Sequence, residues 1–285
     1  MIILALDALD KRMVEKFNCT NLMQEEFGET DISQFTLEKT VIIWASFLAG
    51  KNMEKKIEPP VYLNFEKNLL KLANKIIPSN SKFHSLSPFR HENFLIKLYR
   101  KFRWYLIGSR VWNFRLSARQ TFLKFFNSFK VIDLPAFSFK EKNHRLERIL
   151  LARFFENESF LNRYEEIVWK NHEENKKDFL NSIGKYDLLI GYFNLADAIG
   201  HLSFGIEYKM RKVYYELNDI AKRVQKEAKD DVLLIVSDHG MKAVGRFGDH
   251  TKHGFYSINR KLNLKTPKIT DFYEIIRNLH KMSSS

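Results

Sequence analysis

The segment Val232–Met241 constrains the fold of this 285-residue chain more than any other. Its first five residues are all apolar, which is typical of a strand buried on both faces, as in the parallel sheets of α/β proteins. Asp238 and His239 follow at once, inside the sequence Ser-Asp-His-Gly. Open α/β sheets place their chemistry just beyond the carboxyl ends of their strands, and Asp and neutral His are good ligands of divalent metals. The same pair is also typical of a turn with a helix cap, so other parts of the chain have to decide between a metal site and a cap.

Composition describes a globular chain with 45% hydrophobic and 28% charged residues. Its single cysteine, Cys19, excludes an internal disulfide framework and suits a reducing compartment. No apolar run reaches the roughly 20 residues that a membrane-spanning helix needs. Residues 2–6 are strand-like and follow no basic leader, which argues against a signal peptide. We therefore expect a cytoplasmic protein, with one domain over residues 1–285 that carries an insertion.

The net charge of +13 is concentrated in one part of the chain. Between Lys82 and Arg153 there are 16 Lys and Arg residues against four acidic residues. Such a patch attracts phosphate-bearing partners, which include nucleotides, nucleic acids and anionic lipids.

Two features of the first 50 residues could carry chemistry. The strand over residues 2–6 ends at Asp7, which is either a helix cap or a metal ligand. A short helix is predicted near residues 11–17. Residues 41–49 are apolar on every side, which predicts a buried helix, with Thr40 as its N-cap and Gly50 as its C-cap. The N-terminus of such a helix could bind a phosphate, although Thr40 could equally be a cap and nothing more.

Between about residues 60 and 183 the alternation of strands and helices gives way to a largely helical pattern. Helices are predicted over 64–77, 92–107, 117–129, 143–155 and 158–181, with one strand over 131–135. The basic and aromatic composition resembles nucleic-acid surfaces, but aromatic residues at helical spacing favour a core, and no nucleic-acid-binding motif accompanies them. A pair of interfacial membrane helices is a weaker alternative. We expect this region to form a basic, largely helical cap inserted in the main domain.

After Gly184 the α/β pattern returns. A strand over residues 186–190 leads to Asp197 and His201, which are four residues apart and would share one face of a helical turn. An amphipathic helix over 207–228 then crosses over to the opening strand, as in a parallel βαβ unit. His250 and His253 lie in a glycine-flanked loop, and a helix near 270–281 follows. The pattern predicts an α/β fold with a mostly parallel central sheet and helices on both faces, with no internal repeat and no P-loop.

Taken in chain order, these residues resemble the alkaline phosphatase superfamily, and within it the type I phosphodiesterase/nucleotide pyrophosphatase family. The resemblance rests on an Asp after the first strand, a Thr before a buried helix that ends in Gly, an Asp-x-x-x-His, an Asp-His-Gly and a late His beside Gly. It covers roughly residues 1–55 and 184–260. The middle region is similar to the family in being an inserted cap.

The resemblance implies a site with two divalent metal ions, most often zinc, although the same ligands accept manganese. It implies that one ion is held by Asp7, Asp238, His239 and the Thr40 oxygen. The other is then held by Asp197, His201 and a late histidine. His250 fits the Gly-x-His spacing of the family and His253 fits the His-Gly-Phe/Tyr pattern. Both stay candidates, with His250 slightly favoured.

The activity that the resemblance implies is hydrolysis of phosphodiester or nucleotide pyrophosphate bonds. Thr40 would be the nucleophile, activated by one ion, and a covalent phospho- or nucleotidyl-threonine would then be hydrolysed. The chain departs from the family at Ile42, where Pro is usual, at Ala49, where Thr is usual, and over residues 53–57, where Pro-x-x-His-Gly is usual. Because every candidate ligand position is filled, we expect an active enzyme with a different substrate pocket.

Three alternatives remain at this level. A phosphomonoesterase or a phosphonate hydrolase of the same superfamily would use the same site, whereas Thr40 argues against a sulfatase, which needs a formylglycine derived from Cys or Ser. A protein that binds nucleic acid or an anionic surface through residues 82–153 is a different class of hypothesis. The favoured partner is a small phosphate-ester or nucleotide substrate, and the substrate-binding residues are not predicted.

Overall fold

The computed structural model describes residues 1–36, 38–57, 109–140, 158–228 and 230–284. Its core is a six-stranded sheet in the order β2-β8-β5-β1-β4-β3. The strands are β1 Ile2–Leu6, β2 Glu26–Asp31, β3 Phe129–Ile132, β4 Leu188–Phe193, β5 Leu233–Val236 and β8 His253–Ile258. The four strands β5, β1, β4 and β3 are parallel to one another, while β8 pairs antiparallel with both β5 and β2. The predicted α/β fold with a mostly parallel sheet is therefore confirmed.

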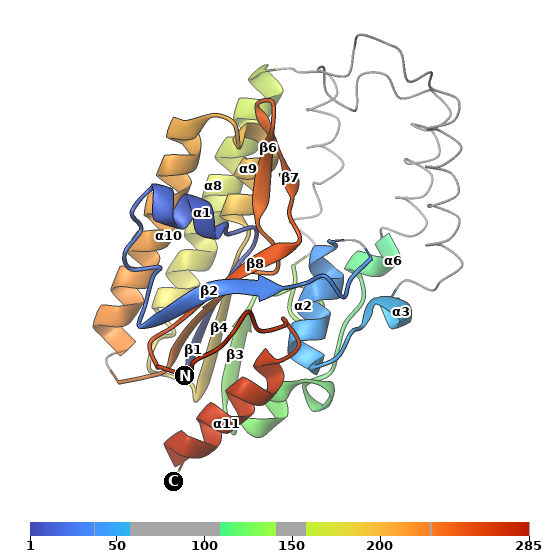
Figure 1. The fold of residues 1–285 in the computed structure, drawn as a ribbon, viewed down its shortest axis with the longest axis vertical. Helices are drawn as coiled ribbons and strands as arrows, with labels where there is room; N and C mark the ends of the chain where they lie inside the picture. The colour runs from blue at the N-terminus through green and yellow to red at the C-terminus, as the bar shows by residue number, and fades with distance from the viewer. Residues whose placement is uncertain (37, 58–108, 141–157, 229, 285) are drawn as a thin grey trace.

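Alternate residues of the central strands face opposite sides of the sheet, and helices cover both sides (Figure 1). On β1, Ile2, Leu4 and Leu6 join one core, and Ile3 and Ala5 join the other. The first side is covered by α1 Lys11–Lys16, α8 Glu158–Leu180, α9 Leu195–Ser203 and α10 Glu207–Ala228. The second side is covered by α2 Thr40–Ala49, α3 Glu54–Ile57, α6 Ser109–Trp112, the 3-10 turns Ala118–Gln120 and Phe122–Phe125, and α11 Phe272–Ser284.

Helix α2 is buried along its whole length except for its last residue, as its apolar sequence predicts. It ends at Gly50, which adopts the left-handed conformation with φ of 66° and donates its N–H to Ser46 O. The prediction that Thr40 is the N-cap is wrong by one residue. Lys39 is the N-cap, because its backbone is extended and its carbonyl accepts from Ile42 N and Ile43 N, and Thr40 is the first helical residue.

The predicted helix over residues 117–129 is also wrong, because this segment forms two 3-10 turns and the start of β3. The break lies at Thr121, whose backbone is extended and whose hydroxyl accepts from Leu123 N and donates to Ala118 O. Local side-chain hydrogen bonds of this kind compete with helix. The interpretation of the aromatic residues as core still holds for Phe122 and Phe126, both of which are buried.

Part of the predicted cap region belongs to the layers of the main domain. Strand β3 pairs with β4, and it begins two residues before the strand predicted over 131–135. Helix α8 packs on β4 through a contact between Phe179 and Phe193. The helices predicted over 64–77, 92–107 and 143–155 lie outside the described residues. Among the helices that the structure describes, none combines the length and hydropathy that a membrane span requires.

Candidate metal centre

The strand-end cluster consists of Asp7, Asp238 and His239, which follow the carboxyl ends of β1 and β5. These strands are neighbours in the sheet, with Ala5 paired to Val236, so the residues after them meet at one edge. His239 Nε2 lies 3.4 Å from Asp7 Oδ1 and 3.4 Å from Asp238 Oδ2. All three side chains are buried, with 2% of Asp7 and none of the other two exposed.

Hydrogen bonds from the surrounding chain fix this cluster. The Ser237 hydroxyl accepts from Leu9 N at 2.9 Å and donates to His239 O at 2.7 Å, which ties the end of β5 to the turn after β1. Ala8 N donates to Asp238 Oδ1 at 3.4 Å, and the Tyr192 hydroxyl donates to Asp7 Oδ2. Each carboxylate therefore has one oxygen held by a donor and the other turned toward His239.

The helix–hairpin cluster consists of Asp197 and His201 on α9 and His250 at the end of β7 Phe247–His250. Asp197 and His201 share one face of α9, as their spacing predicts, with His201 Nε2 3.1 Å from Asp197 Oδ1. His250 Nε2 lies 3.3 Å from the same Asp197 oxygen and 2.9 Å from His201 Nε2.

Two glycines allow the hairpin of β6 Met241–Val244 and β7 to pack directly on α9. A Cβ at Gly200 would lie 2.4 Å from Met241 Sδ, and a Cβ at Gly248 would lie 2.2 Å from the same atom. At Gly200 only the flexible Met241 side chain would have to shift, whereas a Cβ at Gly248 would also lie 2.7 Å from the backbone oxygen of Gly200, so Gly248 is the position that needs glycine for the close approach. The approach brings Gly248 O to 3.3 Å from His201 Nδ1 and carries His250 to the cluster.

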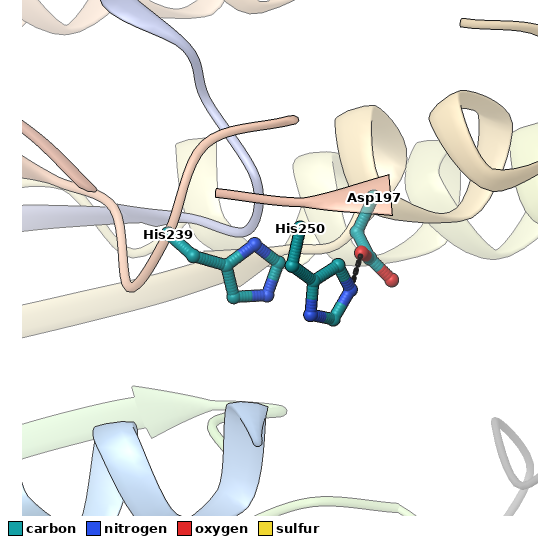
Figure 2. A group of neighbouring side chains, drawn as sticks. All are labelled: Asp197, His239 and His250. Carbon is teal, nitrogen blue, oxygen red and sulfur yellow. Dashed lines mark ion pairs between the residues drawn. The ribbon is translucent and has the colours of Figure 1, made fainter. Parts of the chain in front are cut away.

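The two clusters form one continuous site. The rings of His239 and His250 stack with centroids 3.7 Å apart and planes inclined by 22°. Ligand atoms of Asp197, His239 and His250 all lie within 4.8 Å of one another, and Figure 2 shows the two rings next to each other with Asp197 beyond His250. A side chain from each of three separate elements therefore converges here.

All three histidines are oriented as metal ligands usually are. His201 Nδ1 lies against Gly248 O at 3.3 Å, His239 Nδ1 against Gly240 O at 3.1 Å, and His250 Nδ1 against Glu38 O at 2.9 Å. A carbonyl oxygen can only accept, so Nδ1 carries the proton in each neutral ring and Nε2 presents a lone pair to the centre of the site.

The centre is consequently lined with acceptors that face one another. Within the described residues, no hydrogen-bond partner is found for Asp7 Oδ1, Asp197 Oδ1, Asp238 Oδ2 or His239 Nε2, although all four atoms are buried. Buried polar atoms without partners are costly, and like acceptors at these distances repel unless a cation lies between them. Carboxylate oxygens and imidazole nitrogens are the usual ligand atoms of divalent transition metals, so these residues fit a metal ion.

The pKa values of the two clusters shift in opposite directions. In the strand-end cluster, burial and then the charge of Asp238 raise the pKa of Asp7 well above its ordinary value, and burial raises the pKa of Asp238 to about 7. Burial also lowers the pKa of His239 well below its ordinary value. In the helix–hairpin cluster, burial opposes ionisation of Asp197, but His201 and His250 hold its pKa well below the ordinary value. Burial likewise opposes protonation of His250, yet Asp197 raises its pKa to about 8.

The structure separates the two late histidines. His253 lies on β8, paired with Asp31, and its side chain is exposed, away from both clusters. His250 is the one that meets Asp197 and His201. Thr40 is 9% exposed at the start of α2, and the segment before it is tied to the site by the contact between Glu38 O and His250.

The sequence analysis did not single out three groups that hydrogen-bond to residues of the two clusters. These are the Tyr192 hydroxyl, the Ser237 hydroxyl and the carbonyl of Glu38. For Tyr192 there was a usable signal, because a tyrosine inside a buried strand has a hydroxyl that must find a partner. For a backbone carbonyl the sequence offers no signal.

A third group with ligand-type side chains lies elsewhere, between α8 and α10. His172, Glu173 and Glu216 are close enough together to hold an ion. Lys176 Nζ, however, lies 2.6 Å from both glutamates, so the carboxylates are already compensated by a cationic side chain. We interpret this group as an ion-pair network between the two helices.

The sequence model of the type I phosphodiesterase/nucleotide pyrophosphatase family matches residues 96–276, which is more than half of the chain. The chain belongs to this family. It is accordingly a hydrolase of the alkaline phosphatase superfamily, in a metal-dependent family that acts on small phosphate-ester or nucleotide substrates. The match includes the whole helix–hairpin cluster and the Asp238-His239 pair, whereas Asp7 and Thr40 lie before it. Among curated proteins none matches the chain significantly.

Proposed function

We propose that this enzyme cleaves phosphodiester or nucleotide pyrophosphate bonds with Thr40 as its nucleophile, at a site that binds two divalent metal ions. The observation that carries the proposal is the convergence of buried ligand atoms from Asp7, Asp238 and His239 that have no hydrogen-bond partner among the described residues, beside an Asp197 oxygen that faces only His201 and His250. The family match supports the class of reaction but does not reach Asp7 or Thr40. Their roles rest on the geometry of the site and on the resemblance in sequence.

In this proposal Asp7, Asp238, His239 and the Thr40 oxygen hold one ion. Asp197, His201 and His250 hold the other. Paired catalytic ions lie roughly 3.5–4 Å apart, so their two ligand sets must be neighbours. The two clusters meet this requirement, because the rings of His239 and His250 stack against each other. Three imidazoles and three carboxylates favour zinc, and manganese fits the same set. When bound, such ions lower the pKa of a coordinated hydroxyl and stabilise the leaving oxygen.

The residues of the chain would supply orientation and further electrostatic stabilisation. Thr40 begins α2, so its hydroxyl would lie at the positive end of a buried helix, where the N–H groups of Thr40 and Val41 precede the first helical hydrogen bond, from Ile42 N to Lys39 O. These N–H groups are suited to a phosphoryl oxygen. The contact between Glu38 O and His250 would hold the segment before Thr40 in register with the metal ligands.

The excess of positive charge between Lys82 and Arg153 would attract the phosphate-bearing substrate. Neutralising Arg100, Lys101 and Arg103 together should then raise KM for small phosphodiesters and leave binding of RNA and DNA unchanged. The opposite result would favour the hypothesis of a nucleic-acid-binding surface. We also propose a cytoplasmic location, which suits the single, unpaired Cys19.

The proposed function is tested by metal analysis of the purified chain together with turnover of a chromogenic phosphodiester, a phosphomonoester and a sulfate ester in parallel. We expect two divalent ions per chain and fastest cleavage of the diester. Thr40→Ala should lower diester turnover at least about 10³-fold, as expected when a nucleophile is removed, and Thr40→Ser should retain measurable turnover.

Three outcomes would contradict the proposal. A chain that binds no divalent metal would exclude the two-metal site. Diester turnover that is unchanged in Thr40→Ala would exclude the nucleophile. Faster cleavage of the monoester would favour the phosphomonoesterase alternative in the same fold.

A further inference from the structure

Tyr192 is a buried residue with a polar hydroxyl next to the site, and the proposed mechanism gives it no role. It lies on β4, it is 2% exposed, and it is paired in register with Ala5 of β1. Because side chains alternate along a strand, Tyr192 lies on the side of the sheet that faces α2, together with Ala5. Asp7 follows two residues after Ala5, and its hydrogen bond to the Tyr192 hydroxyl crosses between the two strand ends.

The ring of Tyr192 is held rigidly between the sheet and α2. It packs edge to face against Trp44 of α2, with centroids 5.9 Å apart and planes inclined by 86°. Trp44 is itself fully buried. Because the buried ring packs against Trp44, its hydroxyl is held in one position. A residue that orients a neighbouring functional side chain has to be held in this way.

The hydrogen bond makes the two oxygens of Asp7 inequivalent. Oδ2 accepts from the Tyr192 hydroxyl, since a carboxylate can only accept. Oδ1 faces His239 Nε2 at 3.4 Å and is one of the unpartnered atoms of the site. One oxygen is therefore occupied by a neutral donor and the other is left for the centre.

We infer that Tyr192 is a positioning residue that makes Asp7 a one-oxygen ligand of the strand-end metal. The inference rests on the proposed function, because it assigns Tyr192 a task at that same site. Asp238 shows the same division, with Oδ1 held by Ala8 N and Oδ2 turned to the centre, but there the donor is the backbone. Substitution of Tyr192 therefore changes what holds the Asp7 carboxylate, while every proposed metal ligand stays in place.

The experiment compares Tyr192→Phe with Tyr214→Phe in the full chain. Both remove one hydroxyl from a fully packed ring, but the Tyr214 hydroxyl accepts from Asp10 N at 2.9 Å and contacts no proposed ligand. Each protein is stripped with a chelator, shown to be folded by circular dichroism, and titrated with Zn²⁺ against a chromophoric competitor. Partners that orient metal ligands contribute about 10- to 100-fold in metal affinity, so Tyr192→Phe should weaken one of the two ions by that factor. Tyr214→Phe should stay within about twofold of the unmodified chain.

A double-substitution cycle and a spectrum separate positioning from loss of stability. In the Asp7→Asn background, adding Tyr192→Phe should cause no further loss of Zn²⁺ affinity, because the carboxylate it orients is gone. In the Co²⁺-loaded chain, Tyr192→Phe should alter the visible ligand-field bands, and Tyr214→Phe should leave them unchanged.

Equal Zn²⁺ affinity and equal Co²⁺ bands for Tyr192→Phe and the unmodified chain would overturn the inference, as would an equal loss in the Asp7→Asn background. These outcomes leave the proposed function standing. Failure of the unmodified chain to bind any divalent metal is a different result, and it would remove the proposed function itself.

Discussion

The strand-end cluster and the helix–hairpin cluster contain similar residues but compensate their charges differently. In the strand-end cluster, two carboxylates face one imidazole and at most 2% of any side chain is exposed. In the helix–hairpin cluster, one carboxylate faces two imidazoles, and the side chains of Asp197, His201 and His250 are 14%, 13% and 22% exposed. Burial and the ratio of acids to imidazoles therefore differ together.

This difference explains why the pKa values of the aspartates shift in opposite directions in the two clusters. Asp7 and Asp238 have no cationic neighbour that outweighs their burial, so their pKa values rise. Asp197 has two imidazoles within ion-pair distance, so its pKa falls. A proton on His250 can compensate the helix–hairpin cluster, whereas the strand-end cluster needs either protons on its own acids or a bound cation. If both clusters bind metal as proposed, we expect the strand-end cluster to depend more strongly on its ion.

The largest expected effect comes from removing a carboxylate of the strand-end cluster. Asp238→Asn should abolish one of the two bound ions and lower diester turnover about 10³-fold, because a catalytic ion contributes several kcal/mol to transition-state stabilisation. Metal content per chain and turnover are measured on the same preparation. Asp10→Asn is the matched control, since Asp10 is 5% exposed at the same sheet edge but forms a salt bridge with Arg12 at 2.8 Å. Equal metal loss in both variants would show that burial of a carboxylate, rather than ligation, explains the result.

The next effect separates the two late histidines. His250→Ala should lower diester turnover at least about 100-fold, because it removes an imidazole from the helix–hairpin cluster. His253→Ala should stay within about twofold, since that side chain is exposed on β8. Turnover and metal content, measured for both variants, show which of the two histidines is the metal ligand. If His253→Ala were the inactive variant, the assignment of His250 as the ligand would be wrong.

The smallest expected effect is the pH dependence of metal binding. Ligands bind metal in their deprotonated forms, and Asp238, with a pKa of about 7, is mostly protonated at pH 6. This residue alone should weaken Zn²⁺ binding about tenfold between pH 8 and pH 6. His250, with a pKa of about 8, acts in the same direction in the other cluster. Competition titrations at pH 6, 7 and 8 would contradict this expectation if the affinity stayed constant.

Without metal, the same groups should give stability the opposite dependence on pH. The folded chain keeps the Asp238 proton up to about pH 7, whereas the unfolded chain releases it near the ordinary aspartate value of about 4. The folded state therefore binds more protons over this range, and unfolding in the presence of a chelator should become easier as the pH rises from 4 to 7. His250 extends the trend toward pH 8, because its folded-state pKa is also raised. Thermal unfolding at several pH values, with and without Zn²⁺, would measure both trends.

Local sequence was sufficient for the elements whose pattern is complete within a few residues. The apolar run before Asp238 predicted a buried strand, and the helix over residues 207–228 was predicted with its observed bounds. The spacing of Asp197 and His201 predicted their shared helical face. In each of these cases the periodicity of side chains along a helix or strand is sufficient for the prediction. Helix and strand geometry set the relative positions of nearby residues without contributions from the rest of the chain.

Local sequence was not sufficient where a single side chain competes with the helical period. Thr121 breaks the segment over 117–129, because its hydroxyl forms hydrogen bonds with backbone groups of Ala118 and Leu123. At the start of α2, Lys39 takes the N-cap position instead of Thr40. Propensity is a weak guide at such places, since a few hydrogen bonds decide between alternatives of similar free energy.

By itself, the sequence of this protein determined the type of sheet, the buried helix at whose start the nucleophile is proposed, and the residue types that could bind metal. Tertiary structure decided which of these side chains meet. His250 rather than His253 reaches Asp197, because the hairpin of β6 and β7 packs closely on α9 at Gly200 and Gly248. Tyr192 reaches Asp7 because β4 and β1 are neighbours in register. Both outcomes depend on contacts between segments far apart in the chain, which no local period encodes.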